Sequence, residues 1–199
     1  MTRIIVFAKA PVPGRVKTRL IPALGADGAA ALARVMLMRT LDVAISSAVG
    51  EVELCMDPAP GDPAWQGITL PSGLSLSPQG QGDLGERMAR AVMKRIDELP
   101  VILIGTDCVQ ISKVLLRDAA SALTKADAVI NPCADGGYAL LGLRRYQAKV
   151  FADIAWSTEV VFQQTLAQIT TLRWSVHIGR LVHDIDTPRD LPRWNGYKY

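Results

Sequence analysis

Cysteine and net charge are both scarce in this sequence, and each scarcity excludes a class of protein. Only three cysteines occur, Cys55, Cys108 and Cys133, far apart and in no C-x-x-C spacing. This pattern argues against a disulfide framework and against a structural zinc site. The formal net charge is +3, which is too small for a general nucleic-acid binder, so we expect no nucleic-acid partner.

Long hydrophobic runs are also missing at the sequence level. The first apolar stretch is interrupted by Lys9 and the prolines after it, unlike the apolar centre of a signal peptide. No uninterrupted apolar run approaches the roughly 20 residues that cross a bilayer. We therefore expect a cytoplasmic protein with no membrane partner. The balance of 49% hydrophobic and 21% charged residues is ordinary for a folded protein, and the length of 199 residues suits a single domain over residues 1–199.

Short β-branched segments alternate with helical segments along the chain. This alternation predicts an α/β fold with three layers, α/β/α, around a mostly parallel mixed sheet. Expected strands cover residues 3–8, 52–56, 74–76, 101–104, 128–130, 138–143 and 174–178.

Helices are expected between these strands, with N-caps read from the sequence. The first is apolar around much of its circumference, which favours a homodimer. Expected helices cover residues 25–48 with Asp27 as cap, a segment from the glycines near 82 to about Leu99, residues 112–125 capped by Ser112, a segment to about residue 172 capped by Ser157 or Thr158, and a last short helix capped by Thr187.

The loop after the first expected strand concentrates positive charge. Its two prolines and Gly14 forbid regular structure. In an open α/β sheet the ligand crevice lies beyond the carboxyl ends of the strands. The loop is therefore a candidate anion site, with a phosphate chain as the candidate anion. Its cations are Lys9, Arg15, Lys17 and Arg19.

Carboxylates are predicted at the same rim. Asp107 follows the clearest buried strand, and Asp184 and Asp186 precede the last helix. Mg²⁺ or Mn²⁺ between these carboxylates and a phosphate chain would explain why acidic and basic groups share one rim. Taken singly, each group also has a structural interpretation. Lys9 could be a solvated loop charge, Asp107 a turn cap and Asp186 part of a helix start.

Several motifs together resemble a family. The chain is similar to bacterial glycosyltransferase-A-like proteins known as selenodomain-associated or arsenosugar-type glycosyltransferases. The resemblance runs from Phe7 to Leu191 and implies the nucleotide-diphospho-sugar transferase fold (GT-A, Rossmann-like), shared with 2-phospho-lactate and molybdenum-cofactor guanylyltransferases. The motifs are K-A-P-x-P-G-x-x-K-T-R-L from Lys9, G-D-L-G-E-R-M from Gly82, G-T-D-C from Gly105, D-G-G-Y-x-L-L-G-L from Asp135, W-S-T from Trp156 and D-I-D-T-P-x-D-L from Asp184.

The resemblance also implies roles for individual residues. Asp107, Asp184 and Asp186 would be metal ligands, and Asp107 would thereby be catalytic. Asp135 is the nearest candidate for a general base on position alone. The nucleotide and its phosphates would contact Lys9, Pro13, Gly14, Arg15, Lys17, Thr18, Arg19, Gly82, Asp83 and Arg87, and the acceptor would contact Gly136, Gly137, Tyr138, Trp156, Ser157 and Thr158.

Three functions follow as alternatives. The first is metal-dependent glycosyl transfer from a nucleotide-diphosphate sugar to a small acceptor. The second is nucleotidyl transfer, which joins a nucleoside triphosphate to a small phosphorylated acceptor and releases pyrophosphate. The third is a catalytically weak nucleotide-binding protein. It is suggested by Val109, which stands where the family has a proline after G-T-D-C and whose loop we expect to be looser.

Overall fold

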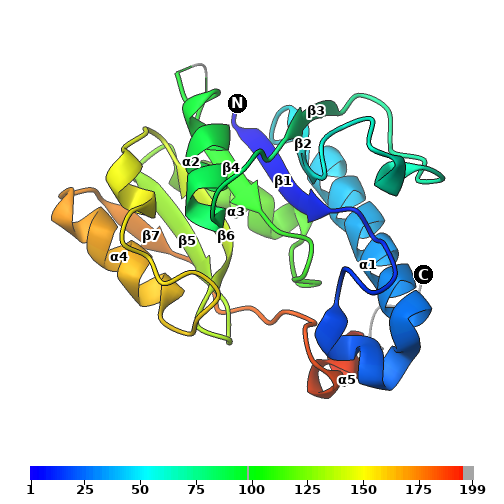
Figure 1. Cartoon of the computed structure of the whole chain (residues 1–199). Helices are drawn as coiled ribbons and strands as arrows, with labels where there is room; N and C mark the ends of the chain where they lie inside the picture. Colours follow the sequence, from blue (N-terminus) through cyan, green and yellow to red (C-terminus); the bar gives the residue numbers. More distant parts are fainter. Residues whose placement is uncertain (98, 195–199) are drawn as a thin grey trace.

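A seven-stranded mixed sheet with helices on both faces forms the body of the protein (Figure 1). The computed structural model describes residues 1–97 and 99–194. The strands are β1 Arg3–Lys9, β2 Val52–Asp57, β3 Ser75–Pro78, β4 Val101–Ile104, β5 Ala128–Pro132, β6 Tyr138–Leu143 and β7 Val176–Ile178. The helices are α1 Ile21–Ser46, α2 Leu84–Met93, α3 Lys113–Ala122, α4 Val161–Thr171 and α5 Leu191–Trp194, with short 3-10 turns at Thr18–Leu20, Pro63–Trp65, Ala148–Phe151 and Pro188–Asp190.

The strand order is β3-β2-β1-β4-β6-β5-β7. Strand β6 runs antiparallel to both of its neighbours, whereas the other adjacent strands pair in parallel. The predicted mostly parallel mixed sheet is therefore confirmed. Strand β6 follows β5 through a hairpin and lies between β4 and β5, paired with both. This position brings the hairpin to the same edge as the ends of β1 and β4.

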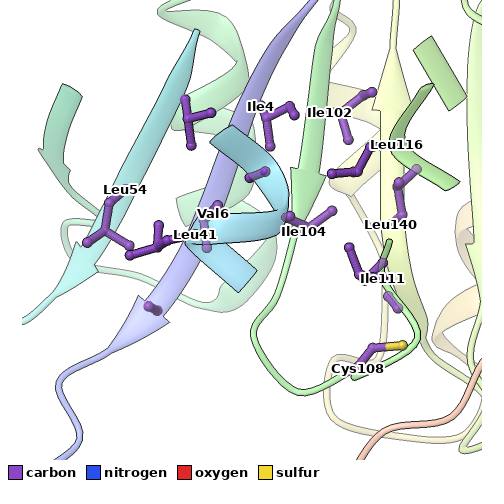
Figure 2. Close-up of a cluster of buried hydrophobic side chains, with 14 of the residues drawn as sticks. Ile4, Val6, Leu41, Leu54, Ile102, Ile104, Cys108, Ile111, Leu116 and Leu140 are labelled. Carbon is purple, nitrogen blue, oxygen red and sulfur yellow. The ribbon is translucent and has the colours of Figure 1, made fainter. Parts of the chain in front are cut away.

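Alternating side chains divide the core between the two faces of the sheet. Ile4 and Val6 of β1 pack with α1 and α3 in one cluster, which Figure 2 shows around Leu41 and Leu116. Ile5, between them in sequence, points to the other face and joins a cluster with α2 and α4. This period of two is what a strand buried on both faces requires. The expected three layers are confirmed.

Helix α1 differs from the expectation at its start. It begins at Ile21 rather than near 25, with Leu20 at the cap position and Gly25 at a non-helical φ of 71°, so Asp27 is not its N-cap. By length and composition alone, Thr18–Ser46 could cross a membrane. The segment contains charged residues, so it is not an uninterrupted apolar run. Core helices of globular domains pass the same test. Here α1 packs Leu37, Leu41 and Ala44 on the sheet, and the predicted homodimer stays a prediction.

Other boundaries test the predicted caps. Ser112 caps α3, and Thr187 begins the Pro188–Asp190 turn, as expected. Helix α4 begins only at Val161 without a side-chain cap, so the expected capping by Ser157 or Thr158 is wrong. The Thr158 hydroxyl instead donates to the Ala155 carbonyl at 2.6 Å. Helix α2 ends at Met93, short of Leu99, and position 98 of the expected helix lies outside the described residues.

Candidate active site

A cavity of about 1000 Å³ lies at the carboxyl ends of β1 and β4. The loop after β1, the N-terminus of α2, the β5–β6 hairpin and residues 156–159 contribute to its wall. Of the predicted site residues, Pro13, Gly14 and Gly136 are not in the lining. The cavity brings the others together: Lys9, Arg15, Lys17, Thr18, Arg19, Gly82, Asp83, Arg87, Asp107, Asp135, Gly137, Tyr138, Trp156, Ser157, Thr158, Asp184 and Asp186.

Lys17 links the predicted phosphate loop to the predicted metal carboxylates. Its Nζ lies 2.6 Å from Asp107 Oδ1 and donates to the Ile185 carbonyl at 2.6 Å. The Lys17 side chain is only 5% exposed, whereas that of Asp107 is 50% exposed. The backbone of Lys17 is left-handed, with φ 48°, a conformation that costs a non-glycine residue free energy. Lys17 therefore holds a cationic position beside Asp107 rather than standing free in the cavity.

The remaining loop cations differ in what they contact. Arg19 pairs with Asp186 at 2.7 Å, and both side chains are solvent-accessible. Lys9 and Arg15 are exposed, and no carboxylate of the described residues pairs with either of them. These two cations are therefore the ones available to an incoming anion.

Asp184 lies at the centre of a carboxylate cluster. Its Oδ1 is buried and has no hydrogen-bond partner among the described residues. Burial, and then repulsion from Asp107 and Asp135, raise the pKa of Asp184 to about 7. Ligand atoms of Cys133, Asp135 and Asp184 all lie within 4.8 Å of one another, a spacing that could hold a metal ion.

The chemistry of these donors fits Mg²⁺ or Mn²⁺. Carboxylate oxygens are the ligands that such hard cations prefer, and an orphaned buried oxygen on Asp184 is a coordination position without a partner. Burial, followed by repulsion from Asp184, raises the pKa of the Cys133 thiol, so it stays protonated and hydrogen-bonds to Asp184. Asp186 is engaged by Arg19 instead, so its predicted role at the metal stays a prediction.

The β5–β6 hairpin explains why D-G-G-Y needs its first glycine. Gly136 has φ 90°, and a Cβ added there would lie 1.9 Å from the Glu159 carbonyl oxygen. Its own carbonyl accepts from Phe162 N at 2.9 Å. The Asp135 carboxylate accepts from Gly137 N at 2.9 Å. The hairpin is therefore locked against the segment that leads into α4.

The N-terminus of α2 meets residues from the far side of the cavity. Asp83 and Glu86 form a capping box, in which Glu86 N donates to Asp83 at 2.8 Å. A Cβ on Gly85 would lie 2.5 Å from the Trp156 indole nitrogen, so the missing side chain is what lets Trp156 pack there. Arg87 pairs with Asp57 at 3.0 Å. Asp83 and Arg87 thus have structural partners, and their predicted nucleotide contacts stay predictions.

Sequence reasoning missed lining residues that carry no familiar motif. Gln79 is 5% exposed and donates to the carbonyls of Ala8 and Cys55, at 3.1 Å each, which joins the ends of β1 and β2. Glu159 directly follows W-S-T and also lines the cavity. Position next to a glycine-rich segment or a motif was the only available signal for either residue.

Val109 does not leave a loosely packed loop. Its side chain is 3% exposed and packs with Leu20, Met36 and Ile185. The backbone beside it is held where Ile185 N donates to the Asp107 carbonyl at 2.9 Å. The looser loop expected from the missing proline is therefore wrong, because apolar burial anchors the segment instead.

Solved structures of other proteins have the same fold as this chain. The chain is 32% identical to a "putative nucleotide-diphospho-sugar transferase" from Desulfovibrio desulfuricans G20, covering 98% of this chain and 87% of that chain with a TM-score of 0.87. It is 18% identical to Rv0371c from Mycobacterium tuberculosis H37Rv, covering 98% of both chains with a TM-score of 0.63. That protein has also been solved in complex with manganese.

A more distant likeness extends to a nucleotidyltransferase. A CMP:2-keto-3-deoxy-manno-octonic acid synthetase complexed with CTP is 13% identical and covers 98% of this chain and 97% of that chain, with a TM-score of 0.57. Identities this low establish the fold alone. The fold is thus that of nucleotide-diphospho-sugar transferases, as the sequence motifs implied.

Sequence comparison gives the family. Among curated proteins, no sequence matches the chain. A family model does match residues 40–158, which contain the carboxyl end of β4, the hairpin and the W-S-T segment of the cavity. The chain therefore belongs to the DUF2064 family, described as uncharacterized protein conserved in bacteria.

Proposed function

We propose that this protein transfers a glycosyl group from a nucleotide-diphosphate sugar to a small acceptor, with Mg²⁺ or Mn²⁺ as cofactor. The observation that carries the proposal is one cavity containing two unpaired cations, Lys9 and Arg15, and a carboxylate cluster around Asp184. A diphosphate needs both kinds of group, because its charge is matched by cations and by a carboxylate-bound metal.

The donor side of the reaction is assigned to the loop after β1. Lys9 and Arg15 would bind the diphosphate, while Lys17 would exchange its contact with Asp107 for a phosphate oxygen. Asp107 and Asp184 would hold the metal, with Cys133 and Asp135 beside them. A bound divalent cation would neutralise the charge that develops on the leaving diphosphate.

The transfer itself balances as a substitution at the sugar. An acceptor hydroxyl oxygen bonds to the anomeric carbon, the bond from that carbon to the β-phosphate oxygen breaks, and the nucleoside diphosphate leaves with the bonding electrons. The hydroxyl proton passes to a carboxylate of the cavity. Asp135 is the candidate base on position, since it is exposed and lies next to the acceptor side.

The test compares two leaving groups in one assay. The protein is incubated with Mn²⁺ and either nucleotide-sugars or the four nucleoside triphosphates, and release of nucleoside diphosphate or pyrophosphate is followed. We expect metal-dependent nucleoside diphosphate release that is weakened by Arg15→Ala. A control, Lys125→Ala, removes an exposed cation beyond α3, outside the cavity lining, and should leave it unchanged. Metal-dependent pyrophosphate release would refute glycosyl transfer.

Nucleotidyl transfer is the second candidate. It is favoured by the concentration of cations after β1, which would suit the larger charge of a triphosphate. Arg19, however, already contacts Asp186, which leaves Lys9, Arg15 and Lys17 for the phosphates. The charge left for phosphates is accordingly closer to the need of a diphosphate.

A further inference from the structure

The charged side chains that line the cavity are segregated. The lysines and arginines among the described lining residues all come from the end of β1, the loop after it and α2, and we call this part the basic half. The β5–β6 hairpin and the segment before α4 contribute acids and aromatic rings but no cation, and we call this part the acidic half. The basic half contains Lys9, Arg15, Lys17, Arg19 and Arg87, and the acidic half contains Asp135, Tyr138, Trp156 and Glu159.

The carboxylates of the acidic half are not neutralised. Asp135 and Glu159 are both exposed, and no lysine or arginine of the described residues pairs with either. The hydrogen bond from Gly137 N occupies only one oxygen of Asp135. An anion placed here would meet repulsion from these carboxylates without a lysine or arginine of the described residues to offset it.

Aromatic surface accompanies these acids. Trp156 is partly buried, packed against the core cluster on the α2 and α4 face of the sheet and over Gly85, so its indole is held in a fixed position at the cavity wall. Tyr138 packs against the same cluster. An aromatic wall with carboxylates beside it offers an apolar face and hydrogen-bond acceptors together. Sugar-like rings and ammonium groups match such a surface.

We infer that the acceptor bound in the acidic half is a hydroxylated small molecule, neutral or cationic, that carries no phosphate or carboxylate group. This inference rests on the proposed function, because it assigns the donor diphosphate to the basic half. It also separates the two enzyme candidates. A phosphorylated acceptor, which nucleotidyl transfer needs, would have to place its phosphate beside Asp135 and Glu159, where the described lining residues offer no lysine or arginine.

Matched pairs of small molecules test the inference directly. Saturation-transfer NMR is recorded with Mg²⁺ and a saturating mixture of nucleoside diphosphates, using methyl glucoside against glucose 6-phosphate and choline against phosphocholine. We expect transfer to at least one unphosphorylated member, lost in Trp156→Ala, and none to the phosphorylated members. Stronger transfer to a phosphorylated member, or none to either unphosphorylated member, would overturn the inference.

Charge variants give a second readout. The double variant Asp135→Asn with Glu159→Gln removes both negative charges with little change of shape, and it should strengthen binding of the phosphorylated members about tenfold or more. Asp118→Asn, an exposed acid on α3 outside the cavity lining, is the matched control and should change nothing. Unchanged binding in the double variant would refute the role given to these carboxylates.

The same samples separate this inference from the proposed function. Binding of the nucleoside diphosphates is followed by ³¹P NMR. If no nucleotide binds, the proposed function fails. If nucleotides bind and the protein still prefers phosphorylated small molecules, the proposed donor site stands and the inference about the acceptor fails.

Discussion

The two halves of the cavity differ in how much of their charge is free. The basic half has more charged side chains, yet Lys17, Arg19 and Arg87 are engaged by Asp107, Asp186 and Asp57. The acidic half has fewer, but Asp135 and Glu159 have no cationic partner among the described residues. The number of charged residues in each half therefore does not give the charge that can act on a ligand, because local ion pairs already neutralise some of these side chains.

The largest expected effect comes from the carboxylate between the two halves. Asp107→Asn should lower metal-dependent transfer about 100-fold or more, since it removes a carboxylate proposed to hold the metal. Asparagine keeps an oxygen that can accept from Lys17, and the side chain is 50% exposed. We therefore expect the melting temperature to change little. Product formation and thermal unfolding are measured together, and full turnover in this variant would remove Asp107 from the mechanism.

The next prediction compares the stability cost of alanine in the hairpin of the acidic half and in the loop of the basic half. Gly136→Ala should destabilise the protein by about 3 kcal/mol, because a positive φ and a clash with the Glu159 backbone act together. Gly14→Ala is the control in the basic half. It also has a positive φ of 78° but open space around the added Cβ, so its cost should be about 1 kcal/mol. Urea unfolding measures both, and equal costs would contradict the tight packing described for the hairpin.

A pH effect comes from the buried carboxylate near the acidic half. The pKa of Asp184 is raised from 3.8 to about 7, so the folded protein keeps a proton that the unfolded chain has released. The stabilising contribution of the protonated form is present below pH 3.8 and is lost as the pH rises through about 7. In metal-free buffer, wild type should lose more unfolding free energy over this range than Asp184→Asn.

The control for the pH experiment is Asp186→Asn, which removes a carboxylate paired with exposed Arg19. This variant should follow the wild-type dependence of stability on pH. Urea titrations at several pH values with a chelator provide the measurement. Parallel curves for wild type and Asp184→Asn would rule out a raised pKa at Asp184.

The smallest expected effect concerns the cation nearest to Asp107. Lys17→Met should raise the affinity of the nucleotide-free protein for Mn²⁺ about tenfold, because the ammonium no longer competes for Asp107. Nucleotide affinity should fall in the same variant. Mn²⁺ binding followed by electron paramagnetic resonance checks this, with Lys9→Met as control. Unchanged Mn²⁺ binding would show that Lys17 does not exclude the metal.

Much of the fold follows from local sequence patterns. The apolar runs around Ile4 and Ile102 predict strands because they are short and rich in β-branched residues. The run around Leu140 predicts a strand because the two glycines before it mark a tight turn. Ser112 and Thr187-Pro188 predict helix starts because a cap is a local interaction. The start of α4 could not be predicted from Ser157, since the positive φ of 65° at that residue is part of a turn shaped by contact with the hairpin.

The sequence predicted which residues line the candidate site better than it predicted how those residues contact one another. Motifs at strand ends identified Lys17 and Asp107 because topology gathers such ends at one edge. That the two pair with each other depends on the left-handed backbone of Lys17, which no motif encodes. Gln79 and Glu159 were missed because a buried amide and an exposed acid become notable only when the fold places them at the cavity.

The contact between Gly85 and Trp156 joins the two halves of the cavity. Gly85 belongs to the first turn of α2, beside the basic half, and Trp156 belongs to the wall of the acidic half. A donor that contacts the first turn of α2 and an acceptor that contacts the indole would act on the same interface. Thermodynamic linkage then requires that each ligand change the affinity of the other by an identical factor. Substitution of Gly85 would alter that factor even where neither ligand touches it.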